Sequence, residues 1–289
     1  MESHTLRRIA GALAAVALVS CAAIASAASG RVEQSGLFAL VGGTPKIESK
    51  FWVSHPSDLS GTLKVRQFTL DGKPILDYDV DMEHIMHMII VRDDFATFAH
   101  VHPDFDTTTG TFWQAFTKEA NHRYYVYADS TPRGIGQQVF RFTLDNSGPI
   151  ARSAPVGGPS ERNAIAGSYT VTLSRTTLAA NRAKNLDVTI VEGGEPAQDL
   201  AAYLGAAAHA VFINTVTLAY VHLHPMVRGQ QMKVKAGKTG AMNMSMGGGK
   251  SGPFMQMAVP ALPAGTYKLW IQFLGNGTVY TVPFTLLAQ

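Results

Sequence analysis

Two histidine motifs with identical spacing are the part of this sequence best suited to chemistry. The first, HMIIVRDDFATFAHVHP, starts at His87, and the second, HAVFINTVTLAYVHLHP, starts at His209. Both read His, twelve residues, His, any residue, His, Pro, at a constant offset of 122 residues. A spacing kept in two copies is typical of one structural unit used twice. The six histidines are His87, His100, His102, His209, His222 and His224.

Three imidazoles at fixed spacing favour a metal site. Neutral imidazole is the commonest metal ligand, and this set suits copper, zinc or iron. The alternative is that the histidines are half-buried polar residues, hydrogen-bonded within a sheet. Use of the spacing in two copies favours the metal, although the copies need not be equal. His84 and Met86 lie beside the first motif, where the second copy has Ala206 and Ala208, so we count both as further candidate ligands.

Methionines sharpen the choice of metal. Met242, Met244 and Met246 occupy every second position of the segment AMNMSMGGG, which has no apolar partners of its own. Thioether sulfur is a soft ligand that selects Cu(I) over zinc or iron, so this segment predicts copper capture. The alternative is a disordered loop whose methionines are merely oxidisable. Met255 and Met257 alternate on an expected strand and fit ordinary core positions.

Cysteine usage restricts the ligand set. Cys21 is the only cysteine of the chain, and it lies in the N-terminal segment discussed below. The body of the protein therefore has no disulfide, and a metal site there must use His, Met, carboxylate or backbone ligands. A Cys-ligated zinc site and a blue-copper centre, which needs a thiolate, are excluded.

The N-terminus has the features of a targeting segment. Arg7 and Arg8 precede an apolar run, and Ala25-Ser26-Ala27 follows it as an A-x-A cleavage signal. We therefore expect export, into a periplasm or out of the cell. The sequence LVSC ending at Cys21 also resembles a bacterial lipobox, so a lipid tether to a membrane through Cys21 is the alternative to a free protein.

The remaining sequence predicts short strands separated by turn residues. Lys46–Val53, Gly61–Leu70, His84–Val91 and Tyr124–Ala128 alternate or are rich in β-branched and aromatic residues. We predict an all-β chain of two tandem β-sandwich domains, Ig-like or cupredoxin-like, related by the internal repeat. Gln198–Ala208 is the best helix candidate, and its counterpart Leu76–Met86 should hold a turn or short helix. The expected divisions are a signal peptide at 1–27, domains at 28–146 and 167–289, and a linker at 147–166.

Each motif is expected to form a β-hairpin. In the first, His87–Val91 would be one arm and Thr97–His102 the other, with the turn centred on Asp93 and Asp94 so that His87 lies opposite His100. Side chains alternate across a strand, so His100 and His102 should share one face with His87. This geometry would let three imidazoles meet.

With these residues in view, the chain resembles bacterial secreted proteins that pair Ig-like or cupredoxin-like β-domains, and is similar to the YtkA-like domain group. The resemblance rests on HMIIVRDDFATFAHVHPDF, on AYLGAAAHAVFI followed by AYVHLHP, and on GTYKLWIQF near the end. It implies the fold and export, and handling of copper or other heavy metals. Methionine before the first histidine of the second motif is frequent in that group, whereas this chain has Ala208.

Three functions remain open on the sequence. The first is a copper-binding protein for storage, resistance or delivery, with Cu(I) or Cu(II) as the ion and zinc as the competing choice. The second is a three-histidine metalloenzyme with Glu83 or Asp93 as acid or base, which the second copy does not support because Gly205 and Thr215 stand there. The third is a non-catalytic interaction module with structural histidines and a protein partner of unknown kind. The net charge of +3 and the scattered basic residues give no support for nucleic-acid binding.

Overall fold

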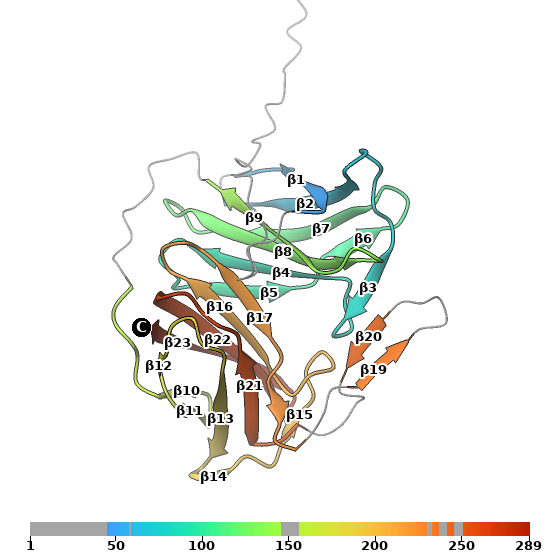
Figure 1. Cartoon of the computed structure of the whole chain (residues 1–289). Helices are drawn as coiled ribbons and strands as arrows, with labels where there is room; N and C mark the ends of the chain where they lie inside the picture. Colours follow the sequence, from blue (N-terminus) through green and yellow to red (C-terminus); the bar gives the residue numbers. More distant parts are fainter. Residues whose placement is uncertain (1–44, 58, 146–155, 230–232, 237–241, 246–250) are drawn as a thin grey trace, which may run out of the picture.

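The computed structural model contains only strands, turns and irregular segments among the residues that it describes (Figure 1). These are residues 45–57, 59–145, 156–229 and 251–289, together with the backbone of 233–236 and 242–245. Two β-sandwiches follow one another along the chain and stack on each other. The prediction of an all-β protein with two tandem sandwich domains is confirmed.

The first sandwich consists of two antiparallel sheets. One has the order β1 (Ile47–Ser54), β2 (Ser60–Thr69), β7 (Thr111–Thr117) and β6 (Asp104–Asp106). The other has the order β3 (Tyr78–Asp81), β8 (Tyr124–Pro132), β4 (Met86–Arg92) and β5 (Phe98–Val101), with β9 (Gln138–Leu144) on β8. The two sheets enclose a core that includes Leu63, Val65, Met88, Phe112 and Phe142.

The second sandwich repeats this plan. One sheet has the order β10 (Asn163–Ala166), β11 (Tyr169–Leu173), β13 (Lys184–Glu192), β21 (Phe254–Val259) and β18 (Met226–Val227), with β14 (Glu195–Pro196) on β13. The other has the order β12 (Thr177–Leu178), β23 (Thr278–Ala288), β22 (Gly265–Gly275), β16 (His209–Asn214) and β17 (Tyr220–Leu223), with β15 (Leu200–Ala201) on β22. β10 lies within the range expected to be a linker. Met255 and Met257 are buried in this core, as predicted.

The pairing order shows which strands are repeats of each other. β1-β2-β7-β6 corresponds to β11-β13-β21-β18, and β8-β4-β5 corresponds to β22-β16-β17. The second copy carries one extra hairpin, β19 (Lys233–Ala236) and β20 (Met242–Ser245). This hairpin crosses to the first sandwich, where β20 pairs in parallel with β3 beside it (Figure 1). Its insertion breaks the constant offset between the repeats downstream of the second motif.

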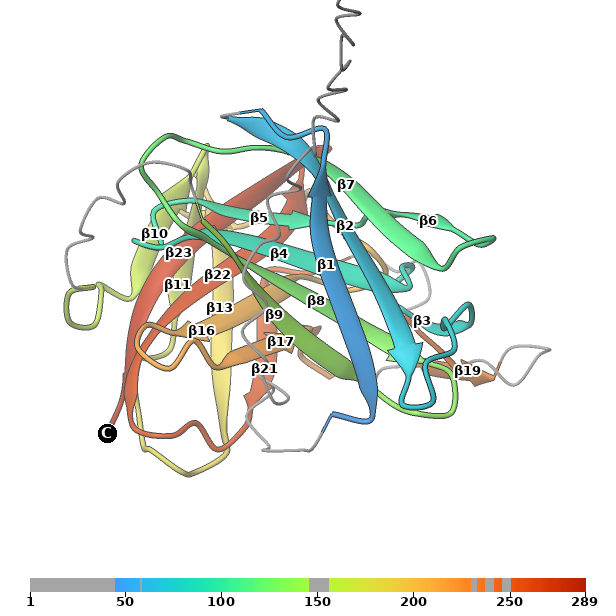
Figure 2. The ribbon, with the colours of Figure 1, turned by 90° about the horizontal axis from the view of Figure 1, so that it is seen from above.

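The two sandwiches pack through the equivalent sheets that carry the histidine motifs. Figure 2 shows β4 and β5 of the first sandwich crossing β22 and β23 of the second. A separate apolar cluster joins them, formed by Ile89, Val91, Phe95, Tyr127, Val139, Val211, Ile213, Tyr220 and Trp270. Alternate residues of β4 and β16 therefore face a sandwich core on one side and the domain interface on the other, which is why both strands are buried almost throughout.

The aromatic contacts of this interface follow the repeat. Phe98 of β5 stacks on Trp270 of β22 with ring centroids 4.8 Å apart, and Tyr220 of β17 stacks on Tyr127 of β8 at 4.9 Å. In each pair a residue of one hairpin covers the long central strand of the other domain. The two halves of the interface are therefore related by an approximate two-fold axis, and each contributes the same kind of contact.

Two local predictions were wrong. The expected helix at Gln198–Ala208 is replaced by β15 and a tight turn, in which Leu204 has φ of 50° and the Tyr203 and Ala206 backbones bridge. Ala207 and Ala208 of this segment are buried in the second core instead of forming a helix surface. The register of the first hairpin is also shifted, because Ile89 pairs with His100. The shift is two residues, so the histidines keep the same face.

Candidate metal centre

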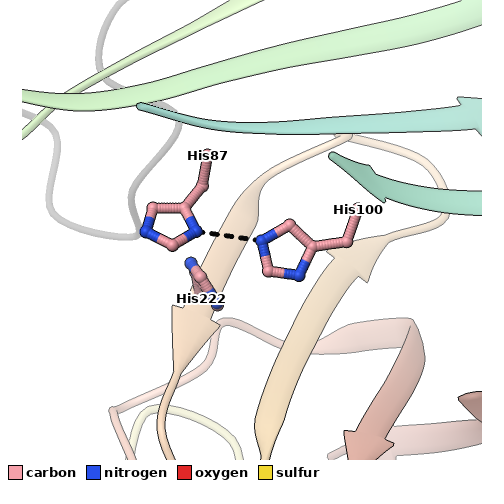
Figure 3. Close-up of side chains that lie close together, drawn as sticks. All are labelled: His87, His100 and His222. Carbon is pink, nitrogen blue, oxygen red and sulfur yellow. Dashed lines mark hydrogen bonds between the residues drawn. The ribbon is translucent and has the colours of Figure 1, made fainter. Parts of the chain in front are cut away.

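The six motif histidines gather in one place, where the two sandwiches meet. His87 and His100 project from the first sandwich toward His222, which projects from the second (Figure 3). The ring centroids of His87 and His222 are 5.1 Å apart, and those of His100 and His209 are 5.3 Å apart. Candidate ligand nitrogens of His87, His100 and His222 lie within 4.8 Å of one another, as do those of His209, His222 and His224. Both groups could hold a metal ion.

Within each half, ring nitrogens point at each other. In the first half His87 Nδ1 lies 2.9 Å from His100 Nε2 and 3.2 Å from His102 Nε2. In the second half His209 Nδ1 lies 3.1 Å from His222 Nε2, and the His224 ring centroid is 4.9 Å from that of His209. Each hairpin therefore brings its three imidazoles together, and the domain interface brings the two sets together.

The outward nitrogens of these rings are held by oxygen atoms. His87 Nε2 donates to the carbonyl oxygen of Asp81 at 3.0 Å, and His209 Nε2 donates to that of Tyr203 at 3.1 Å. Asp81 and Tyr203 occupy equivalent positions of the repeat. A carbonyl oxygen can only accept, so each of these rings carries its proton on Nε2 and presents the Nδ1 lone pair to the other histidines. Metal-binding histidines are oriented by this kind of hydrogen bond.

Two further residues reach across the domain interface. Asp129 of β8 pairs with His87 in the sheet, and Gln272 of β22 pairs with His209, so the two hold equivalent positions. Gln272 Oε1 accepts from His100 Nδ1 of the other domain at 2.8 Å, while its Nε2 donates to Thr281 at 3.0 Å. Asp129 Oδ2 lies 3.8 Å from His222 Nδ1, again across the interface. Gln272 thus orients His100 of the other domain by a hydrogen bond, while Asp129 lies beside His222 without a hydrogen bond between them.

Burial governs the protonation of the centre. It lowers the pKa of His87 to about 4 and that of His100 to about 3, and it lowers those of His209 and His222 well below the ordinary value. Burial also raises the pKa of Asp129 to about 7. At neutral pH the imidazoles are therefore uncharged, which is the form that binds a metal.

The remaining predicted ligands are placed differently. His84 lies at the edge of the centre, with its ring stacked on that of His102 at 3.7 Å. Met86 is buried in the first sandwich core, on the opposite face of β4 from His87, so the structure does not bring it to the histidines. Met242 and Met244 lie on β20, whose Met244 is in register with Asp81 of β3; the described part is their backbone only. Met246 lies outside the described residues, as do the expected signal peptide and Cys21.

Asp129 and Gln272 were not predicted from the sequence. Each stands directly opposite the first histidine of its motif, which the pairing of β8 and β22 alone reveals. The one sequence signal would have been an alignment of the two repeats beyond the motif. That alignment is obscured by the extra β19–β20 hairpin, which removes the constant offset.

The predicted acid–base candidates give catalysis no support. Asp93 lies at the turn end of the first hairpin, where its Oδ1 is 3.0 Å from His122 Nδ1. Together with Asp94 these residues form a third group of possible ligands. Asp94 already forms an ion pair with Arg92 at 2.7 Å. We therefore interpret Asp93, Asp94 and His122 as part of an ion-pair network near the surface. Glu83 lies in the turn before β4, with φ of 72°.

Fold and site together define an all-β protein of two tandem sandwiches with a buried histidine centre at their interface. The chain belongs to the family described as "Domain of unknown function (DUF8832)", whose model matches residues 50–148 and 163–289. A search of curated proteins gives no match. No described helix is long and apolar enough to span a membrane.

Solved structures similar to the chain are other strand-rich proteins. A two-domain fibronectin type-III segment of chicken tenascin is 12% identical, with 83% of this chain and 98% of that chain covered and a TM-score of 0.22. A Salmonella alpha-2-macroglobulin mutant is 13% identical, with 86% and 15% covered and a TM-score of 0.22. A marsupial T cell receptor is 9% identical, with 83% and 97% covered, also at 0.22. The sheet topology described above carries the fold assignment without these similarities.

Proposed function

We propose that the protein is an exported metal-binding protein that binds copper through its histidine centre and serves in copper storage, resistance or delivery. The observation that carries the proposal is the convergence of unprotonated imidazole nitrogens in a buried site. His87 and His100 point lone pairs at each other across 2.9 Å, because their other nitrogens donate to the oxygens of Asp81 and Gln272. Two facing lone pairs repel unless a cation lies between them. At neutral pH the low pKa values of these rings disfavour a proton in that place, so a metal ion fits best.

The choice of copper is supported by the ligand types. Imidazole and thioether together suit Cu(I), while imidazole alone also suits zinc. The strand that carries Met242 and Met244 joins the first sandwich at β3, in register with the residue whose carbonyl holds His87. Methionines on this hairpin would deliver or collect Cu(I) beside the histidines. The resemblance to the YtkA-like group supports the same reading.

Export is supported by the N-terminal sequence. Arg7 and Arg8, the apolar run and Ala25-Ser26-Ala27 form a signal-peptide pattern. A site without cysteine suits an oxidising compartment, where thiols would be lost to disulfides. Cys21 gives the proposal a second form, in which the protein is tethered to a membrane by a lipid on that residue.

The decisive experiment is metal analysis of the mature protein. The purified chain would be loaded anaerobically with Cu(I), or with Zn²⁺, separated from free ion, and assayed for metal and affinity. We expect stoichiometric Cu(I) bound more tightly than Zn²⁺, and its loss in a His100→Ala, His102→Ala double variant. His55→Ala is the matched control, because His55 is exposed. A wild-type protein that retains no copper would refute the proposal.

A second function is favoured by one observation. The short nitrogen–nitrogen contacts at 2.9 and 3.1 Å are also the geometry of shared-proton imidazole pairs. Such pairs would fasten the sandwiches without an ion and leave an interaction module for a protein partner. This reading predicts no retained metal, with the domains still associated after chelation.

A further inference from the structure

The four central histidines form a near-regular tetrahedron of rings. The six distances between the ring centroids of His87, His100, His209 and His222 are 5.1, 5.2, 5.2, 5.3, 5.3 and 6.1 Å. An imidazole bound at about 2.0–2.1 Å has its ring centre about 3.2 Å from the ion, which places the centres of four tetrahedral imidazoles about 5.2 Å apart. Five of the six distances match that value.

In each of the four rings, one nitrogen faces an oxygen atom outside the group and the other nitrogen is left to bind an ion. The outward nitrogen of His87 faces the Asp81 carbonyl, that of His209 faces the Tyr203 carbonyl, and that of His100 faces Gln272 Oε1. The outward nitrogen of His222 faces the Asp129 carboxylate at 3.8 Å. The inward nitrogens are the Nδ1 atoms of His87 and His209 and the Nε2 atoms of His100 and His222, which are the atoms in the 2.9 and 3.1 Å contacts.

We propose that the centre binds one metal ion, shared by both domains and held by His87, His100, His209 and His222. The inference rests on the proposed function and states how that site is built. The geometry is tetrahedral, which suits Cu(I) or Zn²⁺ and disfavours Cu(II), whose nitrogen sites are square-planar or tetragonal. His102 and His224 lie outside the tetrahedron, at either end.

The local charge supports a cation between the domains. Asp129 is buried, and the hydrogen-bond partners that the structure describes for its carboxylate are the neutral Gln137 and Tyr220. Asp81 Oδ1 is also buried and has no hydrogen-bond partner among the described residues. Two carboxylates in such surroundings are stabilised by a nearby positive charge. Because two ligands come from each sandwich, the ion would join the domains, and its binding would stabilise their interface.

The test is the number of ions per chain and their dependence on each domain. The mature protein would be titrated with Zn²⁺ and, anaerobically, with Cu(I), and Co²⁺ would report tetrahedral geometry through its visible absorption. We expect one ion per chain. His87→Ala in the first domain and His209→Ala in the second should each weaken binding of that same ion by more than about 100-fold.

His55→Ala is the matched control, because His55 is exposed. His102→Ala and His224→Ala distinguish a site of four histidines from one that uses all six. They remove histidines of the same motifs that lie outside the tetrahedron, so each should still bind one ion within about ten-fold of the wild-type affinity. Folding of every variant is checked by circular dichroism, with glutamine replacing alanine where a variant unfolds. If no variant folds, two ions per chain in the wild-type protein still overturn the shared ion, and one ion with a tetrahedral Co²⁺ spectrum supports it.

The two claims fail in different ways. Two ions per chain, or full-affinity binding that survives in His209→Ala, would overturn the shared ion and leave the metal-binding function standing. Equal loss in the His102→Ala and His224→Ala variants would also overturn it. Absence of binding of both Zn²⁺ and Cu(I) by the wild-type protein would overturn the shared ion together with the proposed function.

Discussion

The two halves of the histidine centre share a backbone but differ in chemistry. Both hairpins place three imidazoles alike, and both hold the first histidine through a carbonyl at the equivalent position. Around them the first half has His84 and the second has Ala206, and the residues that face across the interface are Asp129 and Gln272. Backbone pairing fixes ligand position in a sheet, whereas neighbouring side chains tune charge and affinity. The two copies therefore share the arrangement of the histidines and differ in the neighbouring side chains that set charge and affinity.

The largest expected effect is loss of stability of the metal-free protein in acid. The folded-state pKa values of His87 and His100 are about 4 and 3, below the ordinary 6.5. The unfolded chain therefore binds protons that the fold excludes, and the free energy of unfolding should fall as pH drops from about 6.5 to 4. Denaturant titrations across this range, with chelator present, measure the effect.

Two carboxylates of the first sandwich, Asp129 and Asp81, change the stability with pH in the opposite direction to the histidines. The raised pKa values of Asp129, about 7, and Asp81, about 6, mean that the fold gains protons there as pH falls, which adds stability. The histidines outnumber them, so the net effect of acid remains a loss of stability.

Replacing His209 and His222 by leucine should relieve acid sensitivity more than replacing His100 and His102, because the former pair is more deeply buried. A stability that does not change between pH 6.5 and 4 would contradict this prediction.

The aromatic stacks test whether the halves contribute equally to the interface. Trp270→Ala removes the partner of Phe98, and Tyr127→Ala removes the partner of Tyr220. Each should lower the free energy of unfolding by about 3–5 kcal/mol, the usual cost of truncating a buried aromatic residue. Chemical denaturation of both variants measures it, with the exposed Trp113→Ala as control. A cost below about 1 kcal/mol in one variant alone would show that one half dominates.

Asp129 and Gln272 test the difference in charge. Asp129→Asn keeps the shape but removes the carboxylate beside His222, and should weaken metal binding by about 10–100-fold, as expected for a residue that orients a ligand. The reciprocal Gln272→Glu places a carboxylate beside His100 and should strengthen binding of a cation. Competition titrations with a chelator of known affinity measure both. Equal affinity in wild type and Asp129→Asn would remove Asp129 from the site.

The smallest effect is expected at His84. Its ring stacks on His102 at the edge of the centre and is partly exposed, while the second half has no histidine there. His84→Ala makes the halves alike at this position and should change metal affinity by less than about three-fold. A loss as large as that of Asp129→Asn would instead make His84 a ligand of the first half.

The sequence determined the strands, the repeat and the grouping of three histidines on one face of each hairpin, because alternation along a strand is a local property. It also predicted a turn or short helix at Leu76–Met86, where the structure has a turn before β4. At Gln198–Ala208 the alanines predicted a helix, and the structure has β15 and a turn instead. A two-residue shift in the first hairpin changed which residue lies opposite His100 but left the shared face intact. Local pattern therefore predicted each half of the site.

Tertiary structure alone decided that the halves meet. His100 and Gln272 are 172 residues apart in the chain and are joined by the packing of two whole sandwiches. That packing depends on the shape of the apolar cluster around Tyr127 and Trp270, which spacing along the chain does not encode. The same packing made Asp129 of the first sandwich a neighbour of His222 of the second. Contacts between domains depend on complementary surfaces, and these exist only after both domains have folded.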